Sequence, residues 1–110
     1  MSTTINVPNN KYVDRVEPLG QPTVARQLTA TSTSQNTALS ANVRRVSIRA
    51  RTSDIRYQVG VGVQTANAST SHFIANGERL DIVVPLNANI AIIREIGASV
   101  DGSLAVTELT

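Results

Sequence analysis

The stretch VRRVSIRARTSDIRYQVGVGV, residues 43–63, carries the clearest structural pattern in the chain. In its first half Val46, Ile48 and Ala50 alternate with charged or polar residues, and residues two apart on a strand lie on the same face. Residues 54–63 repeat this alternation with Ile, Tyr and Val at every second position. Thr-Ser-Asp at 52–54 is a polar turn, so we expect two strands that pair as an antiparallel hairpin.

Further short runs of the same kind continue to the end of the chain. We expect strands over 72–75, 79–85, 90–96 and 103–109, with Asn76-Gly77 and Asp101-Gly102 as hairpin turns. The run at 90–96, IAIIREI, is apolar on both faces and predicts a central, buried strand. Short strands joined by tight turns predict an all-β protein, a small antiparallel β-sandwich or jelly-roll-like domain.

The composition changes near residue 42. The segment before this point holds Pro8, Pro18 and Pro22 and a polar run at 29–40, so we expect an extended N-terminal arm over 1–42 and a β-sandwich domain over 43–110. Alternation at 23–31 predicts a strand within the arm, and 37–41 adds a short edge strand. Such an arm is held by its own domain or by a neighbouring subunit, and the sequence leaves both open.

The residues needed for most enzyme chemistry are missing from this single-domain chain of 110 residues. It has no cysteine, which excludes disulfides, thiolate metal sites and cysteine nucleophiles. Its one histidine, His72, follows Ser71 on a predicted strand, where neighbouring side chains point to opposite faces. There is no glycine-rich phosphate loop. We therefore expect no catalytic residue, no metal and no cofactor.

The start of the sequence and its hydropathy bear on location. Residues 1–10, MSTTINVPNN, have neither a basic region nor an apolar run, so they do not predict a secretory signal. No stretch approaches the roughly 18 apolar residues of a membrane-spanning helix. We expect a protein made in a cytoplasm and not held in a membrane.

Arginine is the charged residue that stands out. Ten basic residues face eight acidic ones, and Lys11 is the only lysine. We expect four of the clustered arginines to share one face of a strand pair, either as a solvated surface with ion pairs or as a protein interface. Nucleic acid is the weakest option, because single-strand binders interleave aromatic residues. The interface candidates are Arg45, Arg49, Arg51 and Arg56 of that face, with Arg44, Tyr12, Arg15 and Arg26.

Three segments of the chain resemble a group of small virion proteins of tailed bacteriophages. They are VRRVSIRA (43–50), IRYQVGVGVQTANASTSHFIANGERLDIVV (55–84) and NIAIIREIGASVDGSLAVTEL (89–109). The shared pattern is an Arg-rich first strand, a glycine-bearing strand, a Ser/Thr-rich loop, a turn with Asn-Gly, and a final strand ending in VTEL. Such proteins are similar to capsid decoration (cement) proteins and other accessory head proteins.

The resemblance implies a structural role on the capsid exterior, with the major capsid protein as partner. It implies a jelly roll or sandwich, often trimeric, and an arm that reaches over the shell or over neighbouring subunits. The two-sided apolar run at 90–96 separately predicts a homo-oligomer. Two alternatives stay open: a tail, fibre or head–tail junction component, and a glycan-binding β module.

Overall fold

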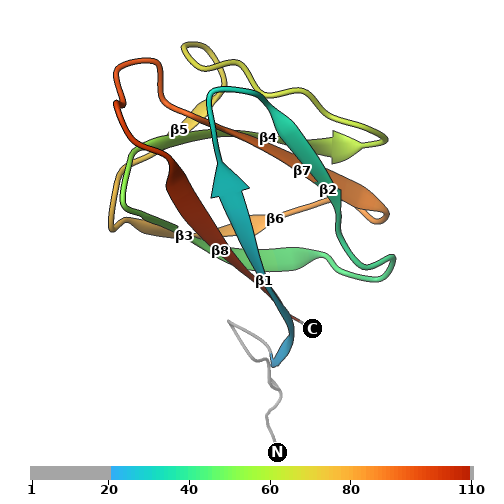
Figure 1. Cartoon of the computed structure of the whole chain (residues 1–110). Helices are drawn as coiled ribbons and strands as arrows, with labels where there is room; N and C mark the ends of the chain where they lie inside the picture. Colours follow the sequence, from blue (N-terminus) through green and yellow to red (C-terminus); the bar gives the residue numbers. More distant parts are fainter. Residues whose placement is uncertain (1–20, 110) are drawn as a thin grey trace, which may run out of the picture.

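The computed structural model describes residues 21–109, and within this range the chain forms eight β-strands and no helix (Figure 1). This confirms the predicted all-β class. The strands are β1 (Pro22–Ala30), β2 (Gln35–Ala38), β3 (Arg45–Arg51), β4 (Ile55–Val61), β5 (His72–Ile74), β6 (Arg79–Val83), β7 (Ala88–Arg94) and β8 (Gly102–Leu109). In this range no helix is long and apolar enough to cross a membrane.

The strands form two four-stranded antiparallel sheets that pack face to face (Figure 1). One sheet has the order β1-β8-β3-β6 and the other has the order β2-β7-β4-β5. Of the connections between these strands, only β4 to β5 stays within one sheet. Every other connection crosses to the opposite sheet, which is the arrangement of an eight-stranded jelly roll.

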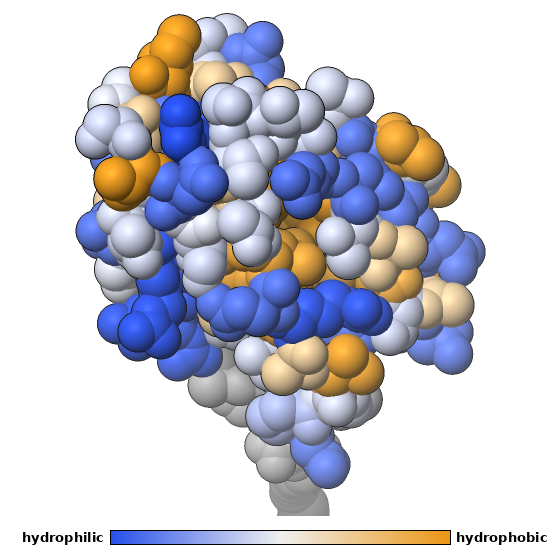
Figure 2. Space-filling view, viewed as in Figure 1, coloured by the Kyte–Doolittle hydropathy of each residue, from blue (hydrophilic) through white to orange (hydrophobic). Residues whose placement is uncertain are grey.

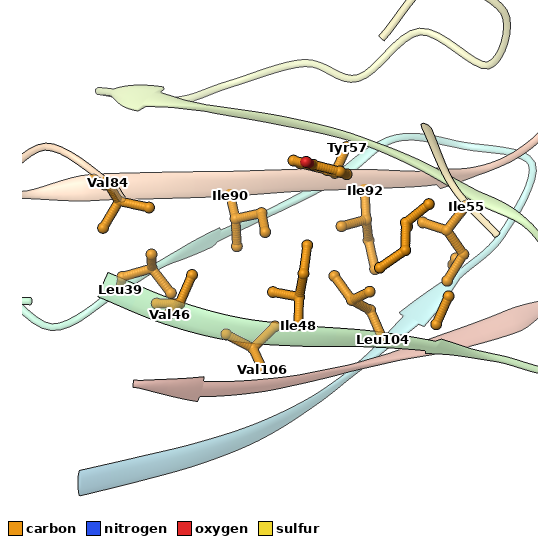
Figure 3. Close-up of a cluster of buried hydrophobic side chains, with 14 of the residues drawn as sticks. Leu39, Val46, Ile48, Ile55, Tyr57, Val84, Ile90, Ile92, Leu104 and Val106 are labelled. Atoms are coloured by element: carbon orange, nitrogen blue, oxygen red, sulfur yellow. The ribbon is translucent and has the colours of Figure 1, made fainter. Parts of the chain in front are cut away.

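The core lies between the two sheets and is built from alternate residues of their strands. Figure 3 shows side chains from β3 and β8 pointing toward side chains from β4 and β7. Ile48, Ile90 and Leu104 are fully buried there. The outward positions of β3 and β8 are polar or small, so the predicted alternation in residues 43–51 is confirmed. Burial of these aliphatic side chains is the main favourable term in folding.

The three turns predicted as hairpins are wrong in that role. Residues 52–54, 76–77 and 101–102 each carry the chain from one sheet to the other. Two of these segments do form tight turns, since Gly77 has φ 87° and Thr52 has φ 78°, both in the left-handed region. Such a turn reverses the chain but does not choose a partner. The apolar faces of β3 and β4 therefore meet across the core, where a hairpin would have placed them side by side.

The segment predicted as an N-terminal arm contributes two edge strands to the sandwich. β1 pairs with β8 from Pro22 to Ala30, with a register shift between Pro22 and Ala25. β2 pairs with β7 over four residues. Residues 43–109 therefore supply only the inner strands and the opposite edges of the two sheets. The remainder of the arm, residues 1–20, lies outside the described residues.

A loop over residues 62–71 covers the second apolar face of β7. Ala66 and Ala68 of this loop pack against Ala91 and Ile93, which point away from the main core. The backbone N–H of Ala66 donates to the Ser34 hydroxyl at 2.8 Å, which ties the loop to the sheet edge. The two apolar faces of β7 are each covered by the chain itself, whereas Ile96, at the end of the predicted 90–96 run, is 72% exposed. The homo-oligomer stays a prediction.

Candidate functional site

The outer face of the β1-β8-β3-β6 sheet gathers three of the seven arginines singled out in the sequence. β3 directs Arg45, Arg49 and Arg51 outward, as its alternation predicts. β6 lies beside β3 and adds Arg79, which the sequence analysis did not single out. In Figure 2 one group of strongly hydrophilic side chains lies at the lower left, near the β3 label of Figure 1, and a second crosses the lower middle of the molecule. We call these four residues the arginine face.

Charge on this face is strongly one-sided. The described strands of the sheet place a single acidic side chain, Asp81, at an outward position. Four arginines and one aspartate give the outward side chains of these strands a formal net charge of +3. Glu108 of β8 points inward and does not offset it. A clustered charge of this size attracts anionic groups, and the attraction weakens as the salt concentration rises.

Two of the arginines are directly opposed. Arg49 of β3 and Arg79 of β6 are register partners across the antiparallel pair. Arg79 is held by its neighbours: its Nε donates to the Ser47 Oγ at 2.8 Å, and its Nη2 lies 3.6 Å from an Asp81 carboxylate oxygen. Among the described residues Arg49 has no hydrogen bond or ion pair. Like charges directly opposite each other destabilise a sheet, so this pair is a stability cost without a structural gain.

A shallow groove of about 340 Å³ runs beside the opposed arginines. Arg49 and Arg79 lie along one side, and Pro22 and Leu109 lie toward the sheet's other edge. Its floor is formed by small side chains, since β8 presents Ala105 and Thr107 and β3 presents Ser47. Small residues on β8 thus leave a hollow into which the arginines of β3 and β6 can reach.

Replacing Arg49 by glutamine should make the protein more stable. The change removes the repulsion with Arg79, and we expect the thermal midpoint to rise by about 1–4 °C at low salt. Arg51→Gln is the matched control, because Arg51 faces Ser103 across the β3–β8 pair. Thermal unfolding at low and high salt checks this. An Arg49→Gln midpoint equal to or below that of Arg51→Gln at low salt would contradict the proposed repulsion.

The prediction that Arg56 belongs to the same face is wrong. Arg56 lies on β4 in the other sheet, because the turn at 52–54 crosses between sheets. Its guanidinium donates to the Ser71 carbonyl at 2.9 Å and to a Glu95 carboxylate oxygen at 3.1 Å. It also lies 4.9 Å from the centre of the Phe73 ring. Arg56 therefore joins β4, β5 and the loop after β7.

Glu95 completes this cluster. The backbone N–H of Gly97 donates to one carboxylate oxygen at 2.8 Å, and Arg56 binds the other. These hydrogen bonds, with that of Gly97 first, lower the pKa of Glu95 despite the opposing effect of burial. A charged carboxylate is thus kept in place at the end of β7.

The other candidates lie elsewhere. Arg26 points inward from β1, and its Nε donates to a buried Glu108 carboxylate oxygen at 3.0 Å. Its charge is paired inside the domain, so Arg26 does not belong to the arginine face. Arg44 is exposed just before β3, at the alternate position to the arginine face. Tyr12 and Arg15 lie outside the described residues.

Among residues 21–109, no side chain near His72 is placed to activate Ser71 as a nucleophile. The Ser71 hydroxyl donates to Gln58 and accepts from the backbone N–H of Asn67, while the His72 ring lies 5.4 Å from the Tyr57 ring. Burial, with a smaller contribution from the Glu78 charge, raises the pKa of Tyr57, so its hydroxyl stays protonated at neutral pH. Within residues 21–109 no cluster of His, Asp and Glu is suited to hold a metal ion.

Comparison with known proteins adds nothing that identifies this chain. No protein-family model matches the sequence, and neither the curated proteins nor the solved structures contain a significant match.

Proposed function

We propose that this protein is a non-enzymatic structural component of a bacteriophage virion that binds the outside of the capsid shell and stabilises it. The observation that carries the proposal is the arginine face, an open sheet surface of net charge +3 in which Arg49 and Arg51 have no partner among the described residues. The family resemblance over residues 43–109 supplies the setting. On this proposal the protein is synthesised in the bacterial cytoplasm and assembled onto the major capsid protein.

The physical chemistry of arginine suits this role. The guanidinium group is planar, is less strongly hydrated than an ammonium group and binds carboxylates through two parallel hydrogen bonds. Arginine is accordingly enriched in protein interfaces. A shell offers many copies of one docking site, so a trimeric decoration protein gains affinity by engaging several of them at once. A modest interface per subunit is then sufficient.

The glycan-binding alternative has less support in the described residues. Sugar sites commonly use an exposed aromatic ring, and Phe73 is 43% exposed. The Arg56 guanidinium already lies over that ring, which removes one of its faces from stacking. The tail, fibre and head–tail junction alternative needs the same kind of surface and differs in the location of the protein.

The proposal is tested on virions of the source phage. Particles purified on a density gradient should contain this chain in many copies, as measured by quantitative mass spectrometry. The recombinant protein should rebind particles stripped of it, and Arg49→Glu should reduce this binding more than Arg44→Glu. Both substitutions change the charge equally, but Arg44 lies off the arginine face. Purified virions that lack the chain would overturn the proposal.

A further inference from the structure

We propose that the groove beside Arg49 and Arg79 binds the carboxylates of an extended acidic protein segment, with two acidic residues separated by one position. This inference rests on the proposed function for the identity of the partner, which would be an acidic segment on the outside of the shell. It goes further in naming the chemistry that the groove recognises and the spacing of the recognised groups.

The groove holds several hydrogen-bond donors that the domain does not use. Arg49 is exposed and has no partner among the described residues. The Ser47 hydroxyl accepts a hydrogen bond from Arg79, so its own hydrogen is free to be donated outward. The Thr107 hydroxyl on the floor has no partner within residues 21–109. Donors of two kinds therefore face the same hollow, which is the composition of a carboxylate site.

A bound anion between the two opposed arginines would turn their arrangement from unfavourable to favourable. Without a ligand, Arg49 and Arg79 repel each other across the β3–β6 pair. A carboxylate placed between two guanidinium groups replaces this repulsion with two charge-assisted attractions. Asp81 lies 3.6 Å from Arg79, and both side chains are exposed to solvent. This ion pair therefore offsets little of the repulsion between Arg49 and Arg79. The stability cost of the pair is then recovered on binding.

The spacing of Arg49 and Arg51 indicates the form of the ligand. They lie two residues apart on one face of β3, a separation of about 6.6–6.8 Å along a strand. An extended peptide laid on the sheet repeats its downward-pointing side chains at the same interval. Acidic residues at positions i and i+2 therefore match these two arginines. One carboxylate lies between Arg49 and Arg79 in the groove, and the other reaches Arg51, which lies beyond the groove lining.

A protein segment fits this face better than nucleic acid does. Proteins that bind single strands stack bases on aromatic side chains interleaved with cations. None of the four described strands in this sheet contains an aromatic residue. The small floor of β8 offers no stacking surface either, whereas it leaves room for a peptide backbone to approach closely.

The test uses short synthetic probes and the purified full-length protein. The probe is a fluorescent peptide Gly-Glu-Ser-Glu-Gly, with Gly-Gln-Ser-Gln-Gly and Gly-Glu-Glu-Ser-Gly as the charge and spacing controls. Binding is followed by backbone amide shifts in NMR at low salt. We expect the first peptide to shift residues of β3, β6 and β8 around the groove, and the glutamine control to cause no shifts. The control with adjacent glutamates should bind more weakly.

Charge reversal locates the site. We expect Arg49→Glu to weaken binding of the Glu-Ser-Glu peptide about tenfold, the effect of losing one charge-assisted contact, and Arg44→Glu to weaken it less than about twofold. Equal loss in the two variants would mean a diffuse charge effect and would overturn the inference. A thymidine octanucleotide that binds the groove more tightly than the acidic peptide would also overturn it, in favour of nucleic acid.

These outcomes separate the inference from the proposed function. If Arg49→Glu protein still decorates the particles normally, the groove inference and the arginine face as docking surface are wrong, whereas the presence of the protein in virions stands. If virions lack the protein while the Glu-Ser-Glu peptide binds the groove and needs Arg49, the virion role is wrong and the carboxylate site stands.

Discussion

Replacing Leu104 by alanine should lower the free energy of unfolding by about 3 kcal/mol, the largest effect we expect from a single side chain in this domain. Leu104 is fully buried on β8, and Figure 3 shows it pointing into the layer between the sheets. Its register partners are Leu28 of β1 and Ala50 of β3, so the strand is held on both sides and cannot move inward to fill the cavity. The total free energy of unfolding of a small domain is only about 5–15 kcal/mol, so this loss is a large part of it.

Urea unfolding followed by circular dichroism measures this change. Thr107→Ala is the control, since Thr107 lies on the outward face of the same strand and we expect a change within about 0.5 kcal/mol. A loss below about 1 kcal/mol for Leu104→Ala, with an unchanged dependence on urea, would show that β8 does not supply the core as described.

Replacing Glu108 by glutamine should lower the free energy of unfolding by about 1–3 kcal/mol at neutral pH. Glu108 is fully buried, and one carboxylate oxygen accepts from Arg26 at 3.0 Å and from the Ser40 backbone N–H at 3.1 Å. The second oxygen has no partner among the described atoms. Glutamine keeps the shape but loses the charge that Arg26 binds. The carboxylate therefore connects β1, β8 and the segment before β3 from inside the sandwich.

The same substitution should remove one source of acid sensitivity. Burial raises the pKa of Glu108, but hydrogen bonds from Ser40 and the bond and charge of Arg26 outweigh it, so the net pKa is lowered. A carboxyl whose pKa is lower in the folded state stabilises the protein fully above its unfolded pKa of about 4.3. That contribution is lost as the pH falls through the folded pKa. The stability difference between wild type and Glu108→Gln should therefore be constant from pH 7 to about 5 and shrink below about 4.

Comparison of the two proteins at each pH isolates Glu108, because Glu95 and the other acids titrate in both. A difference that grows as the pH falls, or one that stays constant to about pH 2, would contradict a stabilising carboxylate at this position.

The faces of the strands could be predicted because they depend on local alternation. Val46 and Ile48 point inward and Arg49 points outward, as the two-residue period requires. The partners of each strand could not be predicted in the same way. β3 pairs with β6 and β8, which lie far along the chain, and the turn residues at 52–54 suit a hairpin and a crossing between sheets equally well. The choice is made by burial of both apolar faces in one core.

The same distinction explains the candidate site. Arg45, Arg49 and Arg51 could be grouped from one strand, whereas Arg56 was placed with them only through the wrong hairpin. Arg79 was missed because its place beside Arg49 depends on a pairing between distant strands. The sequence does predict that Arg79 points outward, because Leu80 and Ile82 occupy the inward positions of the same strand.

The pairing of β1 with β8 could have been predicted from the ion pair between Arg26 and Glu108. Arg26 shares a face with Leu28 and Ala30 in its run, and Glu108 shares a face with Leu104 and Val106. Burying an isolated charge lowers the stability of a protein, so opposite charges on the inward faces of two strands are expected to pair. This complementarity predicts that the two strands are neighbours, which the β1–β8 pairing shows them to be.

We propose that the arginine face is the surface that holds this protein on a capsid shell. A cryo-electron microscopy map of the source phage's virion tests it most directly. We predict density for the sandwich on the capsid exterior, with the outer face of the β1-β8-β3-β6 sheet against the shell and acidic side chains opposite Arg49 and Arg51. Density at the tail, or a sandwich seated with this face toward solvent, would contradict the account.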